Sequence, residues 1–202
     1  YSKETIEKIE ALKKEGKHID PAEIKGMDKE EILHYFYDVD TFEAYKKDWK
    51  VKFEAQRMKG VKFDFDLVDA ETGKVVLEAG KKLTSRSAQK LADEGLTYYK
   101  LAKDKVLGKF LANNVVIAKT GEVLAEAGDE ITEELLEKLN ANKINEIKIL
   151  FIDGVNVGPY IRNTLAIDKN SCREEALLDI YRVMRPGDPP TYDAADSLFK
   201  AL

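Results

Sequence analysis

Apolar residues near the start of the chain recur at helical spacing. Within residues 1–38 they lie three or four positions apart, which is typical of amphipathic helices. Ser2 is a candidate cap for the first helix, and Asp20 precedes a proline at the expected first position of the next. Asp28 and Glu31 have the spacing of a capping box, so a further helix is expected directly after them.

The end of the chain predicts a helix, a rigid corner and a second helix. Ser171 and Glu174 have capping-box spacing, and Pro186 is expected to end the first helix. Thr191 is the expected N-cap of the second helix. The apolar residues of the first helix recur at helical spacing and are expected to form one buried stripe: Ala176, Leu177, Ile180, Tyr181 and Met184.

The middle of the chain contains an internal repeat. Residues 58–101 align without gaps to residues 106–149, an offset of 48 positions. Many residues recur at this offset, among them Gly60, Gly73, Gly80 and Thr84 as Gly108, Gly121, Gly128 and Thr132. Two copies are too few for a solenoid, so the repeat indicates two halves of one small domain.

Each copy predicts the same series of elements. Alternation from Val61 to Leu67 indicates a half-buried strand, and Gly73 supplies the turn of a hairpin. Thr84 is placed to cap a short helix, after which a final strand follows. Before the repeat, the alternation of Trp49, Val51 and Phe53 indicates one more strand.

Composition narrows the function classes. The 202 residues carry a net charge of -5, which argues against a surface that grips nucleic acid over its whole extent. The single cysteine, Cys172, excludes an internal disulfide and suits a reducing compartment. No apolar run approaches the length of about 18 residues that a membrane span needs. The chain starts at Tyr1, and its apolar periodicity continues to Leu202, which is typical of an excised domain.

No catalytic, cofactor or metal constellation stands out. His18 and His34 are the only histidines and both lie far from Cys172, whereas a zinc site needs about four closely spaced ligands. Acidic residues at 64, 66 and 69 lack the spacing of a calcium loop and are expected on the solvated face of a strand. No glycine pattern that cradles phosphate is present.

Residues 158–199, with their Arg-Pro-Gly-Asp-Pro-Pro turn, resemble the lobe domain of the β subunit of bacterial DNA-directed RNA polymerase. Residues 26–38 resemble the lobe segment that precedes an inserted domain. The resemblance implies an α+β fold with a helical lobe portion made from both chain ends, residues 1–38 and 153–202. Residues 39–152 would form a β-rich, barrel-sandwich-like insertion with an internal two-fold repeat.

The resemblance implies a noncatalytic part of a cytoplasmic, nucleoid-associated nucleotidyltransferase. Partners would be the other polymerase subunits, DNA in the whole enzyme, and transcription regulators on the insertion, with no cofactor and no membrane.

Four arginines are candidate DNA contacts, two of them stronger than the others. Arg182 and Arg185 lie three residues apart at the expected end of a helix, where a favourable interaction with the helix dipole is the alternative explanation. The resemblance places this helix end near DNA, so Arg185 and then Arg182 are expected to contact backbone phosphate. Arg173 and Arg162 are weaker candidates.

A stand-alone β-rich binding or carrier module of the biotinyl or lipoyl kind is the alternative. Such a domain needs a modified lysine at a hairpin tip, and Lys74 follows the turn at Gly73. The corresponding position of the second copy holds Glu122, and the usual flanking motif is missing.

Overall fold

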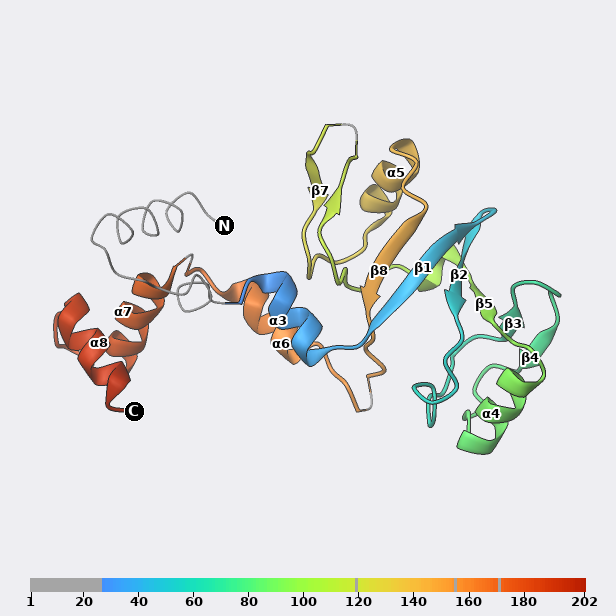
Figure 1. Ribbon diagram of the computed structural model, residues 1–202, viewed down its shortest axis with the longest axis horizontal. Coiled ribbons are helices and arrows are strands. Elements are labelled where there is room, and N and C mark those ends of the chain that lie inside the picture. Colours follow the sequence, from blue (N-terminus) through green and yellow to red (C-terminus); the bar gives the residue numbers. More distant parts are fainter. Residues whose placement is uncertain (1–26, 119, 155, 171) are drawn as a thin grey trace, which may run out of the picture. The chain divides into compact units, whose positions relative to one another are not determined.

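The computed structural model describes residues 27–118, 120–154, 156–170 and 172–202 (Figure 1). The chain divides into two compact units, which are treated separately, with the boundary between Arg162 and Asn163. The helices expected before residue 26, with the caps proposed at Ser2 and Asp20, lie outside the described residues.

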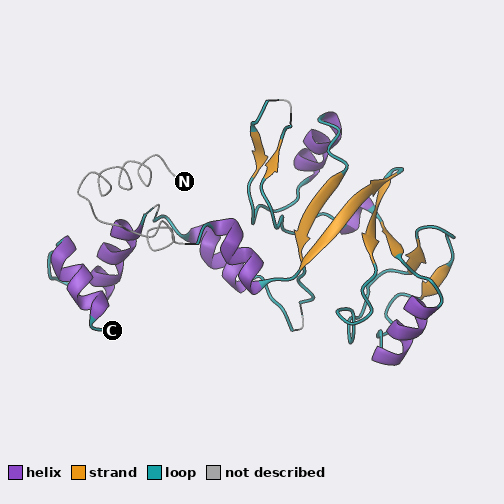
Figure 2. Ribbon diagram, viewed as in Figure 1, coloured by secondary structure: helices purple, strands orange, loops and turns teal. Residues whose placement is uncertain are grey.

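The first unit is an α+β structure. Its main sheet has six antiparallel strands in the order β4-β3-β5-β2-β1-β8, and β6 and β7 form a separate two-stranded sheet (Figure 2). The strands are β1 (Val39–Tyr45), β2 (Asp48–Lys52), β3 (Leu67–Asp69), β4 (Val75–Leu77), β5 (Tyr98–Leu101), β6 (Val115–Val116), β7 (Val123–Ala125) and β8 (Glu146–Leu150). Its helices are α3 (Lys29–Phe36), α4 (Ser85–Asp93) and α5 (Glu133–Ala141), with a short 3-10 turn at Lys103–Lys105.

The hairpin formed by β1 and β2 lies inside the main sheet, one strand away from the edge strand β8. It pairs with β5 on one side and with β8 on the other. Trp49, Val51 and Phe53 are buried, which confirms the strand expected from their alternation. The preceding strand β1 was not anticipated, because Phe42 is its only buried residue and an alternating apolar pattern is therefore absent.

Elements of the first repeat copy recur 48 residues later. Their bounds match to within one residue in the pairs β3 and β6, β4 and β7, α4 and α5, and β5 and β8. Backbone hydrogen bonds recur at the same offset. The Gly80 amide donates to the Phe63 carbonyl at 2.8 Å, and the Gly128 amide donates to the Leu111 carbonyl at 2.7 Å.

The two hairpin turns have the same backbone conformation. Gly73 has φ +71° and Gly121 has φ +72°, in the left-handed region that glycine adopts without steric cost. Each glycine amide donates to the carbonyl four residues earlier, at Asp69 in one copy and Ile117 in the other. The turns expected at these positions are confirmed.

Helix caps follow the sequence signals closely. Asp28 and Glu31 form the expected capping box at the start of α3. Thr84 caps α4 through the Ser87 amide, and Thr132 caps α5 through an equivalent bond. These caps depend on residues three positions apart, so the sequence alone is enough to recognise them.

The strand expected from Val61 to Leu67 is wrong over most of its length. Only Leu67 belongs to β3, and the preceding segment makes a single bridge, between Lys62 and Lys82. Phe63 is buried as the alternation predicts. The backbone departs from a strand because the Asp66 side chain, instead of a neighbouring strand, accepts the Ala79 amide at 2.7 Å.

One hydrophobic core holds the first unit together. Side chains from both repeat copies and from the β1–β2 hairpin belong to a single buried cluster. Among its least exposed members are Val51, Met58, Leu67, Leu83, Leu101, Val106, Leu111, Ile131, Leu136, Leu139 and Ile149. Burial of a large aliphatic side chain contributes about 1.5–3 kcal/mol, so this cluster is the main source of stability for the unit.

The second unit consists mainly of two helices, α7 (Arg173–Met184) and α8 (Tyr192–Lys200). Leu177, Tyr181 and Ala195 form its small buried core. The stripe expected on α7 is therefore only partly buried, since Ile180 is 37% and Met184 48% exposed. Among the described residues α7 packs mainly against α8, so only part of its apolar stripe is covered. Helix α6 (Tyr160–Ile167) crosses the boundary between the units.

The ends of α7 and the start of α8 can be compared with the caps and the helix end expected from the sequence. The N-cap is Cys172, which makes no side-chain capping bond, and Ser171 lies outside the described residues. The helix stops at Met184, as expected from Pro186. Thr191 caps α8 by accepting from the Ala194 amide, which confirms that prediction.

Candidate nucleic-acid contacts and a central cavity

Arg185 lies at the C-cap of α7. Its φ of -129° and ψ of 71° are not helical, although its amide still donates to the Tyr181 carbonyl at 2.8 Å. The side chain is exposed and makes no hydrogen bond or ion pair with the described part of the chain. The guanidinium group is therefore available to an external anion.

The turn after Arg185 is fixed by a contact that the sequence analysis did not identify. The Tyr181 hydroxyl donates to the Asp188 carboxylate at 2.6 Å. This hydrogen bond is the largest cause that raises the pKa of Tyr181, with burial next. The Asp188 amide also donates to the Arg185 carbonyl, so the turn is held to the helix at two points.

Arg182 is exposed but already has an anionic neighbour. It pairs with Asp179 on the preceding turn of α7, and both side chains are about half exposed. Exposed ion pairs of this kind contribute only about 0–1 kcal/mol, so the pair can open when a stronger anion approaches. Arg182 and Arg185 are brought together at one end of the helix.

Arg173 is at the opposite end of α7 and has a different environment. It donates to the Asp196 carboxylate at 3.0 Å and to the Tyr192 hydroxyl at 3.1 Å, which ties α7 to α8. Nine residues separate it from Arg182, or about 14 Å along the helix axis. The structure does not bring Arg173 to the other two arginines.

Arg162 contacts its own unit. Its Nε donates to the Gly128 carbonyl at 2.7 Å, and its guanidinium carbon lies 4.1 Å from the centre of the Phe110 ring. These contacts give Arg162 a packing role.

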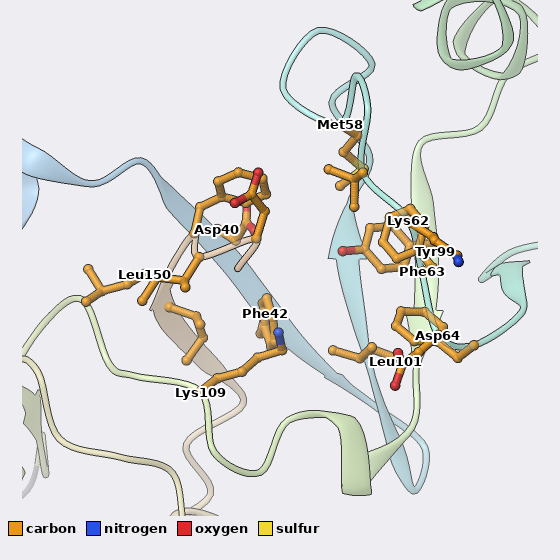
Figure 3. Close-up of a pocket in the computed structure, with 16 residues that line it drawn as sticks. Asp40, Phe42, Met58, Lys62, Phe63, Asp64, Tyr99, Leu101, Lys109 and Leu150 are labelled. Atoms are coloured by element: carbon orange, nitrogen blue, oxygen red, sulfur yellow. The ribbon is translucent and has the colours of Figure 1, made fainter. Parts of the chain in front are cut away.

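A cavity of about 210 Å³ lies within the first unit (Figure 3). Its walls combine apolar and polar surface and come from β1, from both repeat copies and from the segment after β8. The charged residues at its edge are Asp40, Lys62, Asp64, Lys109 and Asp153. No local pattern in the sequence indicates this cavity, because strand pairing creates it from segments that are up to about a hundred residues apart.

Most of these charged groups have partners. Asp40 pairs with Arg57, whose side chain stacks on the ring of Phe151. Burial is the largest influence on Asp40 and raises its pKa, although Arg57 opposes that effect. Asp64 pairs with Lys105 at 2.6 Å, which lowers the pKa of the Asp64 carboxyl.

No group of three or more histidine, cysteine, aspartate or glutamate side chains is placed to hold a metal ion among the described residues. Within the same residues, no helix has the length and apolar character to cross a membrane. The fold and the site together are those of an α+β segment with exposed arginines at one helix end.

Comparison with known proteins identifies the family. No family model matches the chain. The chain is 57% identical over 177 residues to the β subunit of DNA-directed RNA polymerase from Brucella canis and from Brucella abortus. It is 56% identical to the same subunit from Brucella suis biovar 1. Each match covers 88% of this chain but only 13% of the relative. The chain is therefore a fragment of a β subunit of this polymerase family.

Proposed function

We propose that this chain is a noncatalytic segment of DNA-directed RNA polymerase and takes part in DNA-templated RNA synthesis as the lobe that lines the DNA channel. The observation that carries the proposal is the 57% identity over 177 residues to polymerase β subunits. The enzyme as a whole would be a nucleotidyltransferase, with its catalytic residues outside this segment.

In this proposal the lobe portion comprises residues 1–38 and 153–202, and residues 39–152 form an inserted β-rich module. An inserted domain must begin and end at neighbouring points. Contacts at the proposed junction support this requirement, since the Phe151 amide donates to the Asp38 carbonyl at 2.8 Å. The Tyr37 hydroxyl also donates to the Gly158 carbonyl at 3.1 Å.

The module would be a barrel-sandwich-like domain with an internal two-fold repeat. Element bounds that match to within one residue at an offset of 48 support the repeat, as do the recurring glycine hydrogen bonds. The β1–β2 hairpin would join the two copies, because it pairs with the last strand of each, β5 and β8.

Arg185 would be the principal contact with DNA, followed by Arg182 and then Arg173. This order reflects how free each guanidinium group is. Arg185 has no ion pair with the described residues, Arg182 shares an exposed one, and Arg173 is held by two partners. Two phosphate contacts correspond to a salt slope of only about -2, so the isolated chain, with its net charge of -5, would bind DNA weakly.

The partners would be the other polymerase subunits and, in the whole enzyme, DNA. Regulators of transcription would dock on the inserted module. The segment would hold no cofactor and would act in the cytoplasm, in association with the nucleoid.

Replacement of Arg185 in the intact polymerase tests the proposed DNA contact. Arg185→Ala is expected to shorten the lifetime of open promoter complexes about fivefold, equivalent to about 1 kcal/mol for an exposed ion pair. The slope of log affinity against log salt should also become shallower by about 0.9. Arg86→Ala is the matched control, because Arg86 is an exposed arginine on α4 in the proposed insertion. Equal lifetimes for both variants at every salt concentration would show that Arg185 only caps its helix.

A further inference from the structure

The cavity in the first unit has walls suited to a small apolar group. Phe42, Phe63, Met58 and Leu101 line it, and Phe42, Met58 and Leu101 are each no more than 2% exposed. Small-molecule sites in proteins typically combine such walls with a few polar groups that fix the orientation of the ligand.

Two polar side chains that are buried or half-buried in the wall have no direct partner among the described residues. Tyr99 is only 5% exposed, yet its hydroxyl makes no hydrogen bond with any described residue. Lys109 is half-buried and forms no ion pair within the same residues. Figure 3 shows the Tyr99 hydroxyl and the Lys109 ammonium group directed into the cavity. Both groups are therefore placed to donate hydrogen bonds to a ligand in the cavity.

Both residues interrupt the internal repeat. The residue 48 positions before Lys109 is Val61, and the residue 48 positions after Tyr99 is Ile147. Val61 also lines the cavity, and Ile147 is buried in the same core. Each copy therefore carries a hydrogen-bond donor where the other copy has an apolar residue: Tyr99 in the first copy and Lys109 in the second. Both donors line the cavity.

The charge around the cavity favours an anion. Asp40 and Asp64 pair with Arg57 and Lys105, whereas the half-buried Lys109 ammonium group forms no ion pair with the described residues and can therefore pair with an anion in the cavity. Burial lowers the pKa of Lys109, and the two carboxylates oppose this effect. Burial also raises the pKa of Tyr99, so its hydroxyl keeps its proton and donates at neutral pH.

We propose that this cavity binds a small carboxylate with an apolar body. The carboxylate would accept hydrogen bonds from Lys109 Nζ and Tyr99 Oη, and the apolar body would lie against Phe42, Met58 and Phe63. The site is independent of the arginines at the end of α7, so it can be tested without reference to DNA.

Benzoate is a suitable probe, with benzyl alcohol as its neutral counterpart of similar shape. Each is titrated into the 202-residue chain, and amide and side-chain shifts are followed by two-dimensional NMR. Benzoate is expected to bind saturably with a dissociation constant on the order of 1 mM, as its few atoms allow. Benzyl alcohol should bind at least about tenfold more weakly, because it lacks the charge that Lys109 would pair with.

Two variants assign the polar contacts. Lys109→Val introduces the residue that the first copy carries at this position, so its spectrum should remain that of a folded protein. It should weaken benzoate binding about tenfold or more, and Tyr99→Phe should weaken it about fivefold. Lys74→Met, which removes an exposed lysine at the hairpin after β3, is the matched control and should leave the affinity unchanged.

Three results would overturn the proposal. One is the absence of saturable benzoate binding, which would mean that the cavity holds only water. Another is equal affinity for benzoate and benzyl alcohol, which would make the site merely apolar. The third is equal benzoate affinity for the Lys109→Val and Lys74→Met variants, which would place the anion elsewhere.

Discussion

Arg57 neutralises the buried carboxylate of Asp40 at the edge of the cavity, so replacing Arg57 should destabilise the folded protein. Its guanidinium group pairs with Asp40 and donates to the Val39 carbonyl at 3.2 Å. The Arg57 side chain is 22% exposed and that of Asp40 is 12% exposed, so water replaces little of the interaction. Arg57→Met keeps most of the apolar stem but removes the charge.

The expected cost follows from leaving Asp40 buried and unpaired. Loss of one partner of a buried ion pair destabilises a protein by about 3–5 kcal/mol. Because Arg57 is partly exposed, we expect a value near the lower end, about 3 kcal/mol at neutral pH. Asp40→Asn in the same protein should restore most of the loss, because the amide carries no charge that needs a cation.

The pH dependence of this cost has a defined sign. Burial already raises the folded-state pKa of Asp40 above the ordinary value of 3.8, and Arg57 opposes the increase. Without Arg57 the pKa of Asp40 rises further, so the folded state takes up a proton more readily than the unfolded chain. The free-energy cost of Arg57→Met should therefore be largest near neutral pH and decrease as the pH falls towards 3.8.

Urea unfolding measured by tryptophan fluorescence provides the assay. Trp49 is the only tryptophan and is buried in β2, so it reports on the first unit alone. Arg86→Met is the control and should cost less than about 0.5 kcal/mol. The reasoning is refuted if Arg57→Met is as stable as the control, or if its cost is the same at every pH and Asp40→Asn does not relieve it.

Two further substitutions test the packing of the first unit. Tyr37→Phe should cost about 1 kcal/mol in the same unfolding assay, since it removes the hydroxyl that donates to Gly158; an unchanged midpoint would argue against that bond. Gly128→Ala should cost about 1–2 kcal/mol or more, because φ is +87° and the new methyl group would lie 3.1 Å from Lys29 Cε. Gly73→Ala has a similar φ but open space around it, so it should cost less; the reverse order would contradict the packing described here.

Local signals in the sequence were the most reliable guide to the fold. The caps at Asp28, Thr84, Thr132 and Thr191 depend on residues three positions apart and were all predicted correctly. Pairing between distant strands could not be predicted in this way. The β1–β2 hairpin lies between β5 and β8, although no periodic pattern connects these segments.

The candidate sites also differ in whether local sequence patterns or tertiary packing define them. Arg182 and Arg185 could be located at a helix end because proline and periodicity define that end locally. The engagement of Arg173 by Asp196 depends on how α7 and α8 pack, which no local pattern contains. The cavity likewise depends on tertiary pairing, and its only trace in the sequence is the pair of polar residues, Tyr99 and Lys109, that interrupt the repeat.

The central claim, that the end of α7 faces DNA in the polymerase, is tested most directly by site-specific cross-linking. A photo-reactive side chain at Val183, which is 82% exposed, leaves both Arg182 and Arg185 in place. In open promoter complexes of the intact enzyme we expect this position to cross-link to DNA, while the same group at Val75 on β4 does not. Equal or absent DNA cross-linking at the two positions would contradict the account.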